Sequence, residues 1–348
     1  MRPFFLLLFF ASAGVAQDLD VGVRPDAVFV ETVAGNIVPM ERIFFHLVIE
    51  NSSKTPAELE WIRFDVANSK GILFSGQYSG TALMDLFDSA MDRKRIEPTT
   101  KQSLRIDPAE RKAISDIFLD LPKGFIGESL LIEVSYTSEG KASSRKTSVQ
   151  LQRVEGFSAR LPFDGTWYVA SEHGYLDAHK RFLAEAYAYD FLQIGPNGKS
   201  YQRDGRNNAD YYAYGKKVLA AKDGTVVNVR TDVAENVPGE STNVTTPSGN
   251  VVIIDHGNNQ FGYYAHLKPF TVGVKAGAHV KAGDVLGEVG NSGDSTEPHL
   301  HFHVMNNADP NQADGVPLVF EHWKAQSYSR FPIAREFGVL PRGEFVQP

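Results

Sequence analysis

The segment PHLHFHV, residues 298–304, places three histidines in alternation with apolar residues. This is the period of a β-strand, so His299, His301 and His303 are predicted to point to one face. Burying several imidazoles on one face is costly unless something uses them. Same-face residues lie about 6.6–6.8 Å apart along a strand, so a tetrahedral zinc ion can be reached by one of these rings, or by two neighbours, but hardly by all three. Hydrogen-bonded or solvent-facing histidines are the alternative, and for a run of three we favour the metal site.

Any metal in this chain must be held by His, Asp or Glu, because the 348 residues include no cysteine. The same composition excludes disulfides, thiolate zinc sites and iron–sulfur clusters. Nine of the ten histidines lie after residue 170, so the chemistry is predicted to lie in the second half. A net charge of −7 gives no general electrostatic case for binding nucleic acid.

The second half is predicted to position these histidines on β-strands. Residues 251–254, VVII, form a continuous apolar run, which is typical of a strand buried on both faces. A turn over 256–260 follows, and residues 261–267 return as a second strand that carries His266. We place the start of this half near residues 154–156, which gives a domain of residues 156–348 that ends in a C-terminal tail.

Residues 20–155 are predicted to form a separate β-domain. The alternation of apolar and polar residues changes phase near Trp61 and Ile62, which indicates a β-bulge. The sequence SEGK at 138–141 indicates a hairpin, and only residues 82–93 have a helical pattern. Strands of this length between turns favour an immunoglobulin-like β-sandwich. We find no catalytic constellation in this half, and its one histidine, His46, is predicted to be a half-buried sheet residue.

The N-terminus has the pattern of a secretory signal peptide over residues 1–16. Arg2 is followed by the apolar run FFLLLFF at 4–10 and by small residues up to Ala16. An uncleaved membrane anchor is the alternative, but this run falls short of the about 20 residues needed to span a bilayer. We therefore expect an exported protein, periplasmic or secreted, without stable membrane insertion.

Six short motifs follow one another in order in the second half. They are AYDF at 188–191, VLAAKDGTVV at 218–227, YAHL at 264–267, VKAGDVLG at 280–287, GNSG at 290–293 and PHLHF at 298–302. Each motif alone is a weak signal, but together they resemble the lysostaphin-like (LytM-type) zinc metallopeptidases, a family of murein endopeptidases, over about residues 165–306. The resemblance implies a mainly β protein in which an antiparallel β lysostaphin-like peptidase domain follows the β-sandwich.

The resemblance also implies a zinc site with Asp190 and His301 as ligands. The commonest family pattern has its first histidine ligand four residues before the aspartate, where this chain has Ala186. Some members carry that ligand further upstream, so His179 is the best candidate here and His173 is the runner-up. The 11-residue separation between His179 and Asp190 requires a loop or a wide hairpin between the two ligands.

By the same resemblance, His266 and His299 are the active-site histidines that do not bind the metal. His299 could take the proton of the attacking water as general base and His266 could hydrogen-bond the developing oxyanion, or the two roles could be exchanged. His303 departs from the acidic or amide residue expected after this motif. It is predicted to support the site from behind or to line the groove.

The leading hypothesis is an exported Zn²⁺-dependent endopeptidase that hydrolyses peptide bonds in the stems or cross-links of bacterial peptidoglycan. A second hypothesis is a catalytically inactive LytM-type regulator, since some relatives have lost zinc ligands and instead bind and activate cell-wall amidases. A third is a biotinyl or lipoyl carrier domain, which residues 280–287 resemble, but the chain has no hairpin with the modifiable lysine that such domains need. The N-terminal domain could target the enzyme, block its groove or dock a protein partner.

Overall fold

The computed structural model of the protein describes residues 19–24, 28–33, 40–88, 104–122, 124–125, 127–153, 157–171, 179, 182–240, 242–326, 333–338, 340 and 342–348. The predicted signal peptide, the predicted boundary at 154–156 and His173 lie outside these residues. Within them, no helix has the length and apolar character needed to cross a membrane. The chain divides into two compact units, one that includes residues 47–114 and 129–148 and one that includes residues 24–46, 115–128 and 149–348.

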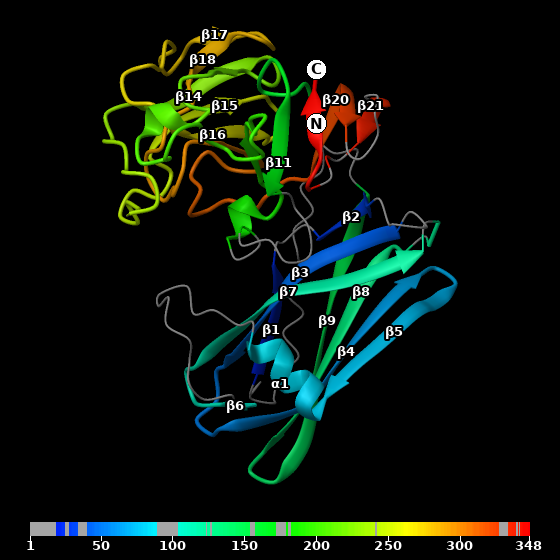
Figure 1. Ribbon diagram of the computed structural model, residues 1–348. Helices are drawn as coiled ribbons and strands as arrows, with labels where there is room; N and C mark the ends of the chain where they lie inside the picture. The colour runs from blue at the N-terminus through cyan, green and yellow to red at the C-terminus, as the bar shows by residue number, and fades with distance from the viewer. Residues whose placement is uncertain are drawn as a thin grey trace. The chain divides into compact units, whose positions relative to one another are not determined.

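The first half forms a nine-stranded sheet (Figure 1). Seven strands follow in the order β1-β3-β2-β9-β8-β4-β5, while β6 pairs with β4 and β7 pairs with β3. Their bounds are β1 Leu19–Arg24, β2 Val28–Val33, β3 Met40–Asn51, β4 Ala57–Asn68, β5 Gly71–Ser79, β6 Arg105–Ile106, β7 Arg111–Pro122, β8 Ser129–Ser138 and β9 Lys141–Arg153. The helix α1, Gly80–Asp88, begins two residues before the predicted one, and the later part of that prediction lies outside the described residues.

Two local predictions for this half are confirmed. The pairing of β4 with β8 passes from Leu59–Tyr136 to Trp61–Ser135, so one extra residue bulges out of β4 beside the predicted position. The hairpin between β8 and β9 turns through Glu139 and Gly140, which both have positive φ angles, 50° and 72°. Such a pair is the geometry of the tight turns that match the twist of two antiparallel strands. The mainly β fold is thereby confirmed, and the immunoglobulin-like arrangement of this half stays a prediction.

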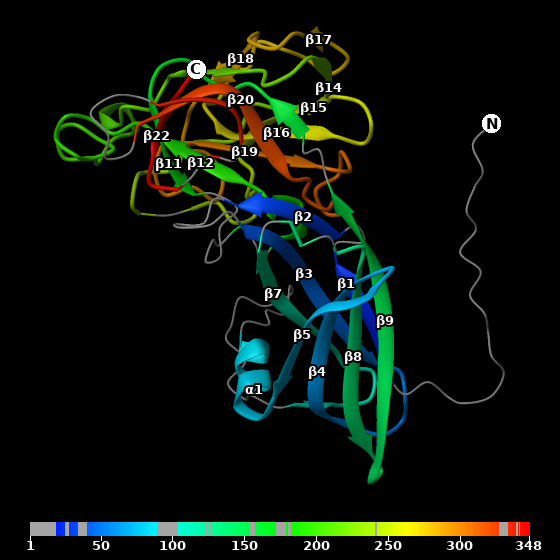
Figure 2. The same ribbon diagram turned by 90° about the vertical axis from the view of Figure 1, so that its right-hand side faces the viewer.

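The second half forms an eleven-stranded sheet, mostly antiparallel, and a separate pair of strands (Figure 2). The order is β10-β20-β22-β11-β12-β19-β16-β15-β14-β17, with β21 paired to β20 and the pair β13-β18 apart. The bounds are β10 Phe157–Ala159, β11 Trp167–Ser171, β12 Tyr189–Leu192, β13 Lys217–Leu219, β14 Gly224–Arg230, β15 Asn250–Asp255, β16 Phe261–Leu267, β17 His279–Val280, β18 Val285–Glu288, β19 Leu300–Met305, β20 Leu318–Gln326, β21 Ile333–Gly338 and β22 Phe345–Gln347. Two short 3-10 helices, η2 Leu183–Glu185 and η3 Asn208–Asp210, lie in the loops.

The two faces of this sheet are chemically different at its centre. Phe191 of β12, Phe302 of β19 and Tyr264 of β16 are fully buried in the main apolar core. The residue next to each of these aromatic residues along its strand faces the other way. On that opposite face, Asp190 of β12 pairs directly with His301 of β19. Because slipping the register by one residue would expose the core side chains, the apolar face fixes where the polar face is presented.

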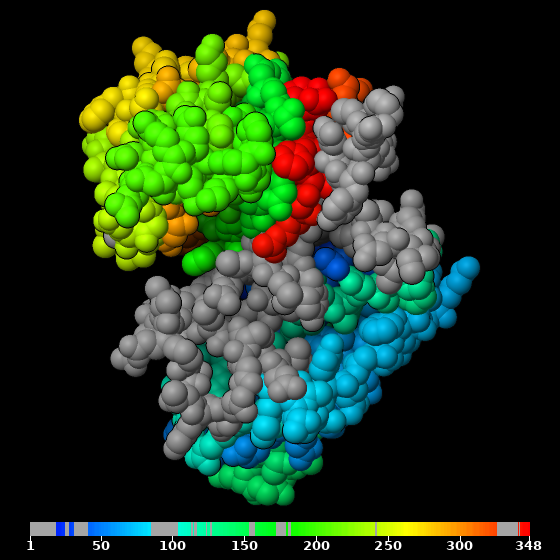
Figure 3. All heavy atoms as spheres, viewed as in Figure 1, coloured from blue at the N-terminus to red at the C-terminus, as the bar shows by residue number. Residues whose placement is uncertain are grey.

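The segment after the motifs forms three strands of the same sheet. The C-terminal strand β22 pairs with β11, and the C-terminal residues (red) lie directly against the green residues of this half in the space-filling view (Figure 3). The first strand of the half, β10, runs parallel to β20. The residues expected to be a C-terminal tail therefore complete the sheet that carries Asp190 and His301.

Candidate metal centre

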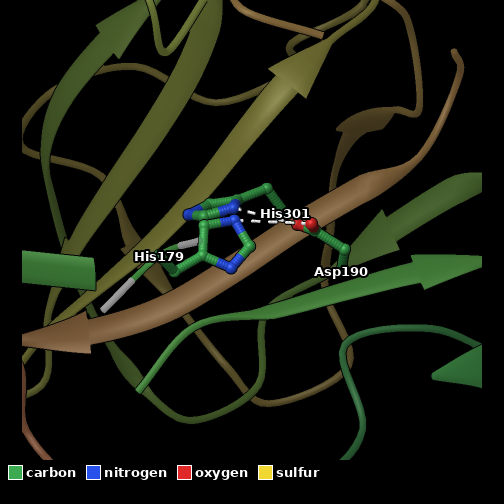
Figure 4. A group of neighbouring side chains, drawn as sticks. All are labelled: His179, Asp190 and His301. Carbon is green, nitrogen blue, oxygen red and sulfur yellow. Dashed lines mark hydrogen bonds and ion pairs between the residues drawn. The ribbon is translucent and has the colours of Figure 1, made fainter. Parts of the chain in front are cut away.

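Three side chains from three segments converge on the polar face of the second sheet: His179, Asp190 and His301 (Figure 4). One nitrogen or oxygen of each lies within 4.8 Å of those of the other two. The Nδ1 atom of His301 is 3.0 Å from Oδ1 of Asp190, and the Nε2 atom of His179 is 3.4 Å from Oδ2. The Asp190 carboxylate is thus directed at both imidazoles. These are the three residues that the sequence proposed as ligands.

His179 reaches the site from a loop that is folded into tight turns. After it, the backbone N–H of Phe182 bonds to the carbonyl of His179, and that of Glu185 bonds to the carbonyl of Phe182. The loop is also anchored to the rest of the fold, because the N–H of Gly315 donates to the carbonyl of Leu183. These turns within residues 182–188, which contain η2, lie between His179 and Asp190 along the chain.

A bulge in β11 places one more polar group behind His179. The pairing of β11 with β12 shifts between Val169 and Ser171, so that Ser171 lies opposite Asp190. The hydroxyl of Ser171 is 3.3 Å from Nδ1 of His179. Nδ1 of this ring therefore faces the serine, and Nε2 faces the carboxylate. Ser171 could not be identified from the sequence, since a lone serine at a strand end carries no signal of its own.

The protonation state of Asp190 suits a metal ligand. Burial would raise the pKa of this carboxyl, but the nearby His179 and His299 and the hydrogen bonds of His299 and His301 outweigh it and hold the pKa well below its usual range. The side chain is therefore a carboxylate at neutral pH, and metal ligands must be deprotonated.

The donor set fits a zinc ion. Two imidazoles and one carboxylate are the ligands of many catalytic zinc sites, which leave the fourth position open. The two oxygens of Asp190 lie 3.0 and 3.4 Å from the two imidazoles, and one donor atom of each of the three residues lies within 4.8 Å of the others. Zinc in this site would have Nε2 of His179, a carboxylate oxygen of Asp190 and Nδ1 of His301 within reach.

The other two predicted histidines lie beside this cluster with matching hydrogen bonds. Nδ1 of His266 is 2.8 Å from the carbonyl oxygen of Ser292, and Nδ1 of His299 is 2.8 Å from that of Glu297. A carbonyl can only accept, so both rings carry a proton on Nδ1 and present Nε2 elsewhere. Nε2 of His299 is 3.5 Å from Oδ1 of Asp190, and the two rings are 4.7 Å apart between centroids.

The two rings differ in their electrostatic environment. Burial lowers the pKa of His266 well below its usual value, and the neighbouring His299 and His301 lower it further. Burial also acts to lower the pKa of His299, but the charge of Asp190 and its hydrogen bond outweigh this, so the pKa is raised. His266 is therefore a neutral imidazole at neutral pH, while His299 holds its proton more tightly.

His266 owes its position to a distortion of β16. The pairing with β15 passes from Val252–Tyr264 to Asn250–Leu267, so Ala265 and His266 together oppose a single residue. His266 also has a φ angle of +60°, a conformation that non-glycine residues rarely adopt. Simple alternation from Tyr264 would point His266 toward the apolar core. The bulge turns it instead to the face that carries His301.

A buried polar network supports His299. The hydroxyl of Ser295 donates to Oδ1 of Asn291 at 2.7 Å and lies 3.2 Å from Nδ1 of His299. The amide of Asn291 in turn donates to Oδ1 of Asn208 at 3.0 Å. Asn291 and Ser295 are almost completely buried. The GNSG motif that contains Asn291 indicates no role for this residue by itself, and the spacing of Ser295 gives no signal.

Four further histidines of the described residues lie away from the carboxylate. His303 is fully buried on the same face, with Nδ1 against His301 rather than Asp190. His279 is exposed in β17, and His256 follows β15 at the start of the turn predicted over residues 256–260. His46 is buried in β3, more deeply than the half-buried position predicted.

Residues 208–313 match the family described as Peptidase family M23. The matched range contains His266, His299 and His301 but begins after His179 and Asp190. The place of those two residues in the site therefore depends on the geometry above.

Known proteins similar to this chain include two curated relatives and one solved structure. DD-carboxypeptidase/endopeptidase Mpg of Neisseria meningitidis serogroup B is 37% identical over 99 residues, which cover 28% of this chain and 21% of Mpg. Peptidoglycan DD-endopeptidase ShyB of Vibrio cholerae is 25% identical over 289 residues, 79% of this chain and 62% of ShyB. The catalytic domain of the prophage-encoded M23 protein EnpA from Enterococcus faecalis is 22% identical with a TM-score of 0.30, covering 46% of this chain and 93% of that one. The chain thus spans less than two thirds of the length of either curated relative.

Proposed function

We propose, from the match of residues 208–313 to peptidase family M23, that the protein is an exported zinc endopeptidase that hydrolyses peptide bonds of bacterial peptidoglycan. The observation that carries the proposal is the convergence of His179, Asp190 and His301 beside two further imidazoles. The substrate class is supported by relatives named as endopeptidases, of which ShyB is named as a peptidoglycan enzyme. Export is supported by the signal-peptide pattern at residues 1–16.

The chain's own residues supply the proton chemistry of this reaction. Zinc, when bound, would activate a water molecule and polarise the scissile carbonyl. A ring whose Nε2 is free can accept the proton of the attacking water, and the lowered pKa of His266 fits such an acceptor. A ring protonated on both nitrogens can donate from Nε2 to the developing oxyanion. We propose the exchanged assignment that the sequence left open, with His266 as base because its pKa is lowered and His299 as donor.

The inactive regulator is the alternative function. Its hallmark in such relatives is the loss of zinc ligands, whereas this chain brings a complete two-histidine, one-carboxylate set together. Stoichiometric zinc in the purified protein would therefore support the enzyme. Protein without zinc that stimulates an amidase would support the regulator.

Digestion of purified peptidoglycan sacculi tests the proposal directly. The zinc-loaded protein should release soluble fragments whose masses correspond to cleaved peptide bonds, and removal of zinc with a chelator should stop the release. His299→Ala should abolish turnover while the metal stays bound, because the ring serves the reaction and not coordination. His279→Ala, an exposed histidine of the same unit that contacts Thr225, is the matched control and should digest sacculi normally. Undiminished digestion by metal-free protein would refute the mechanism.

A further inference from the structure

The imidazole of His303 is fully buried, and it lies at hydrogen-bond distance from His301, one of the three proposed metal ligands. Its Nδ1 atom is 2.8 Å from Nε2 of His301, on the side of that ring away from Asp190. The ring stacks on Tyr263, its cross-strand partner in β16, with centroids 4.5 Å apart and planes 17° from parallel. Nε2 of His303 has no hydrogen-bond partner within the described part of the chain.

Metal binding would determine which ring donates and which accepts in the hydrogen bond between His301 and His303. Two ring nitrogens at hydrogen-bond distance require one N–H donor and one bare acceptor. Nδ1 of His301 faces Asp190, and a nitrogen that binds a metal carries no proton. A neutral His301 that uses Nδ1 for the metal therefore holds its proton on Nε2, and the acceptor for that proton is Nδ1 of His303.

We propose that His303 is a positioning residue for the zinc site: it accepts the Nε2–H of His301 and so fixes both the tautomer and the orientation of that ring. The inference rests on the proposed function, since it assumes that His301 is a ligand. Residues behind a ligating histidine commonly hold it by its second nitrogen, through a carboxylate, a carbonyl or water. Here a second imidazole does so, itself held in place by the stack on Tyr263.

Zinc affinity of two variants separates the hydrogen bond from packing. His303→Phe keeps an aromatic ring against Tyr263 but has no acceptor, and should lower zinc affinity about 10- to 100-fold in competition with a chelator. His303→Asn can place an amide oxygen near the position of Nδ1, and should stay within about threefold of the wild type, because the acceptor is kept. Tyr263→Phe keeps the stack and serves as the control for disturbance of the buried face, with unchanged affinity expected. Circular dichroism checks that each variant is folded.

A second readout follows the proton itself. In zinc-loaded protein labelled with ¹⁵N-histidine, the His301 ring should carry its proton on Nε2, with His303 as its acceptor. Equal zinc affinity of His303→Phe and wild type would overturn the inference, as would an equal loss in both His303 variants or an unprotonated His301 Nε2. If the wild type binds no zinc, the proposed function fails. If it binds zinc and His303→Phe binds it equally well, only this inference fails.

Discussion

Replacing Gly293 with alanine should destabilise the protein much more than the same change at Gly257, although both have nearly the same backbone conformation. Gly293 has φ +84° and Gly257 has φ +82°. An added Cβ at Gly293 would lie 2.3 Å from the backbone N of Gly249 and 2.3 Å from the carbonyl oxygen of Pro247. An added Cβ at Gly257 meets nothing within 4 Å.

The expected magnitudes follow from separating two costs. A left-handed conformation costs a residue with a Cβ about 1–2 kcal/mol, and both variants carry that cost. Steric overlap in a packed region adds about 1–3 kcal/mol, and here the overlapping atoms are backbone, which cannot rotate away. The free energy of unfolding should therefore fall by about 1–2 kcal/mol in Gly257→Ala and by about 2–5 kcal/mol in Gly293→Ala.

Equilibrium urea denaturation, fitted to the transition of the unit that contains both residues, measures this difference. Digestion of sacculi should also suffer in Gly293→Ala, because the neighbouring carbonyl of Ser292 accepts the Nδ1–H of His266. Losses that agree within about 0.5 kcal/mol, the usual size of a neutral surface change, would refute the argument from close approach.

Three further outcomes test the site and its frame. His179→Ala should lower zinc affinity by orders of magnitude in a chelator competition, while His173→Ala should change it little, and equal retention in both would mean that another group completes the site. A fragment of residues 156–348 should be soluble and bind one zinc by elemental analysis, whereas insolubility beside a stable whole chain would contradict its independence. Burial lowers the pKa of His256 in the folded protein. Below about pH 6.5 the unfolded chain therefore binds more protons than the folded one, and the free energy of unfolding decreases as the pH is lowered. His256→Gln should show a shallower fall in the free energy of unfolding between about pH 7.5 and pH 5.5, and an equal slope would count against this account.

Most of what the sequence could predict about the site came from the alternation of apolar and polar residues along its strands. Alternation placed His301 and His303 on one face, and the structure has both on the face of β19 opposite Phe302. His299 precedes β19, which begins at Leu300, so the predicted strand started two residues too early. A period of two is reliable here because the apolar residues on the other face must be buried, which fixes the phase of the strand.

The alternation of residues could not predict which distant strands pair or where a strand contains an extra residue. Asp190 lies opposite His301 across 111 residues of sequence, and composition or spacing alone gives no register over such a separation. The resemblance to a family suggested that pairing, but alternation would have pointed His266 to the wrong face. The extra residue in β16 has no glycine or proline to mark it, and its location depends on the pairing with β15.

Backbone groups form the second part that residue types cannot reveal. The acceptors behind His266 and His299 are carbonyls of Ser292 and Glu297, and every residue has a carbonyl. Their role depends on how the loop folds and not on which side chains it carries. Only the buried Asn291 and Ser295 leave a trace in the sequence, and a polar residue in a loop is no signal by itself.

The carbonyls of Ser292 and Glu297 belong to one short loop, and this has a consequence for how the active site can change. A shift of the backbone of this loop alters the hydrogen bonds of His266 and His299 together, so the loop cannot change the orientation of one ring without the other. Pairs of substitutions in residues 290–298 should therefore show effects on turnover that do not add, as is usual for groups that act as a unit. A partner or peptide that displaced this loop would switch off proton acceptor and proton donor in a single step.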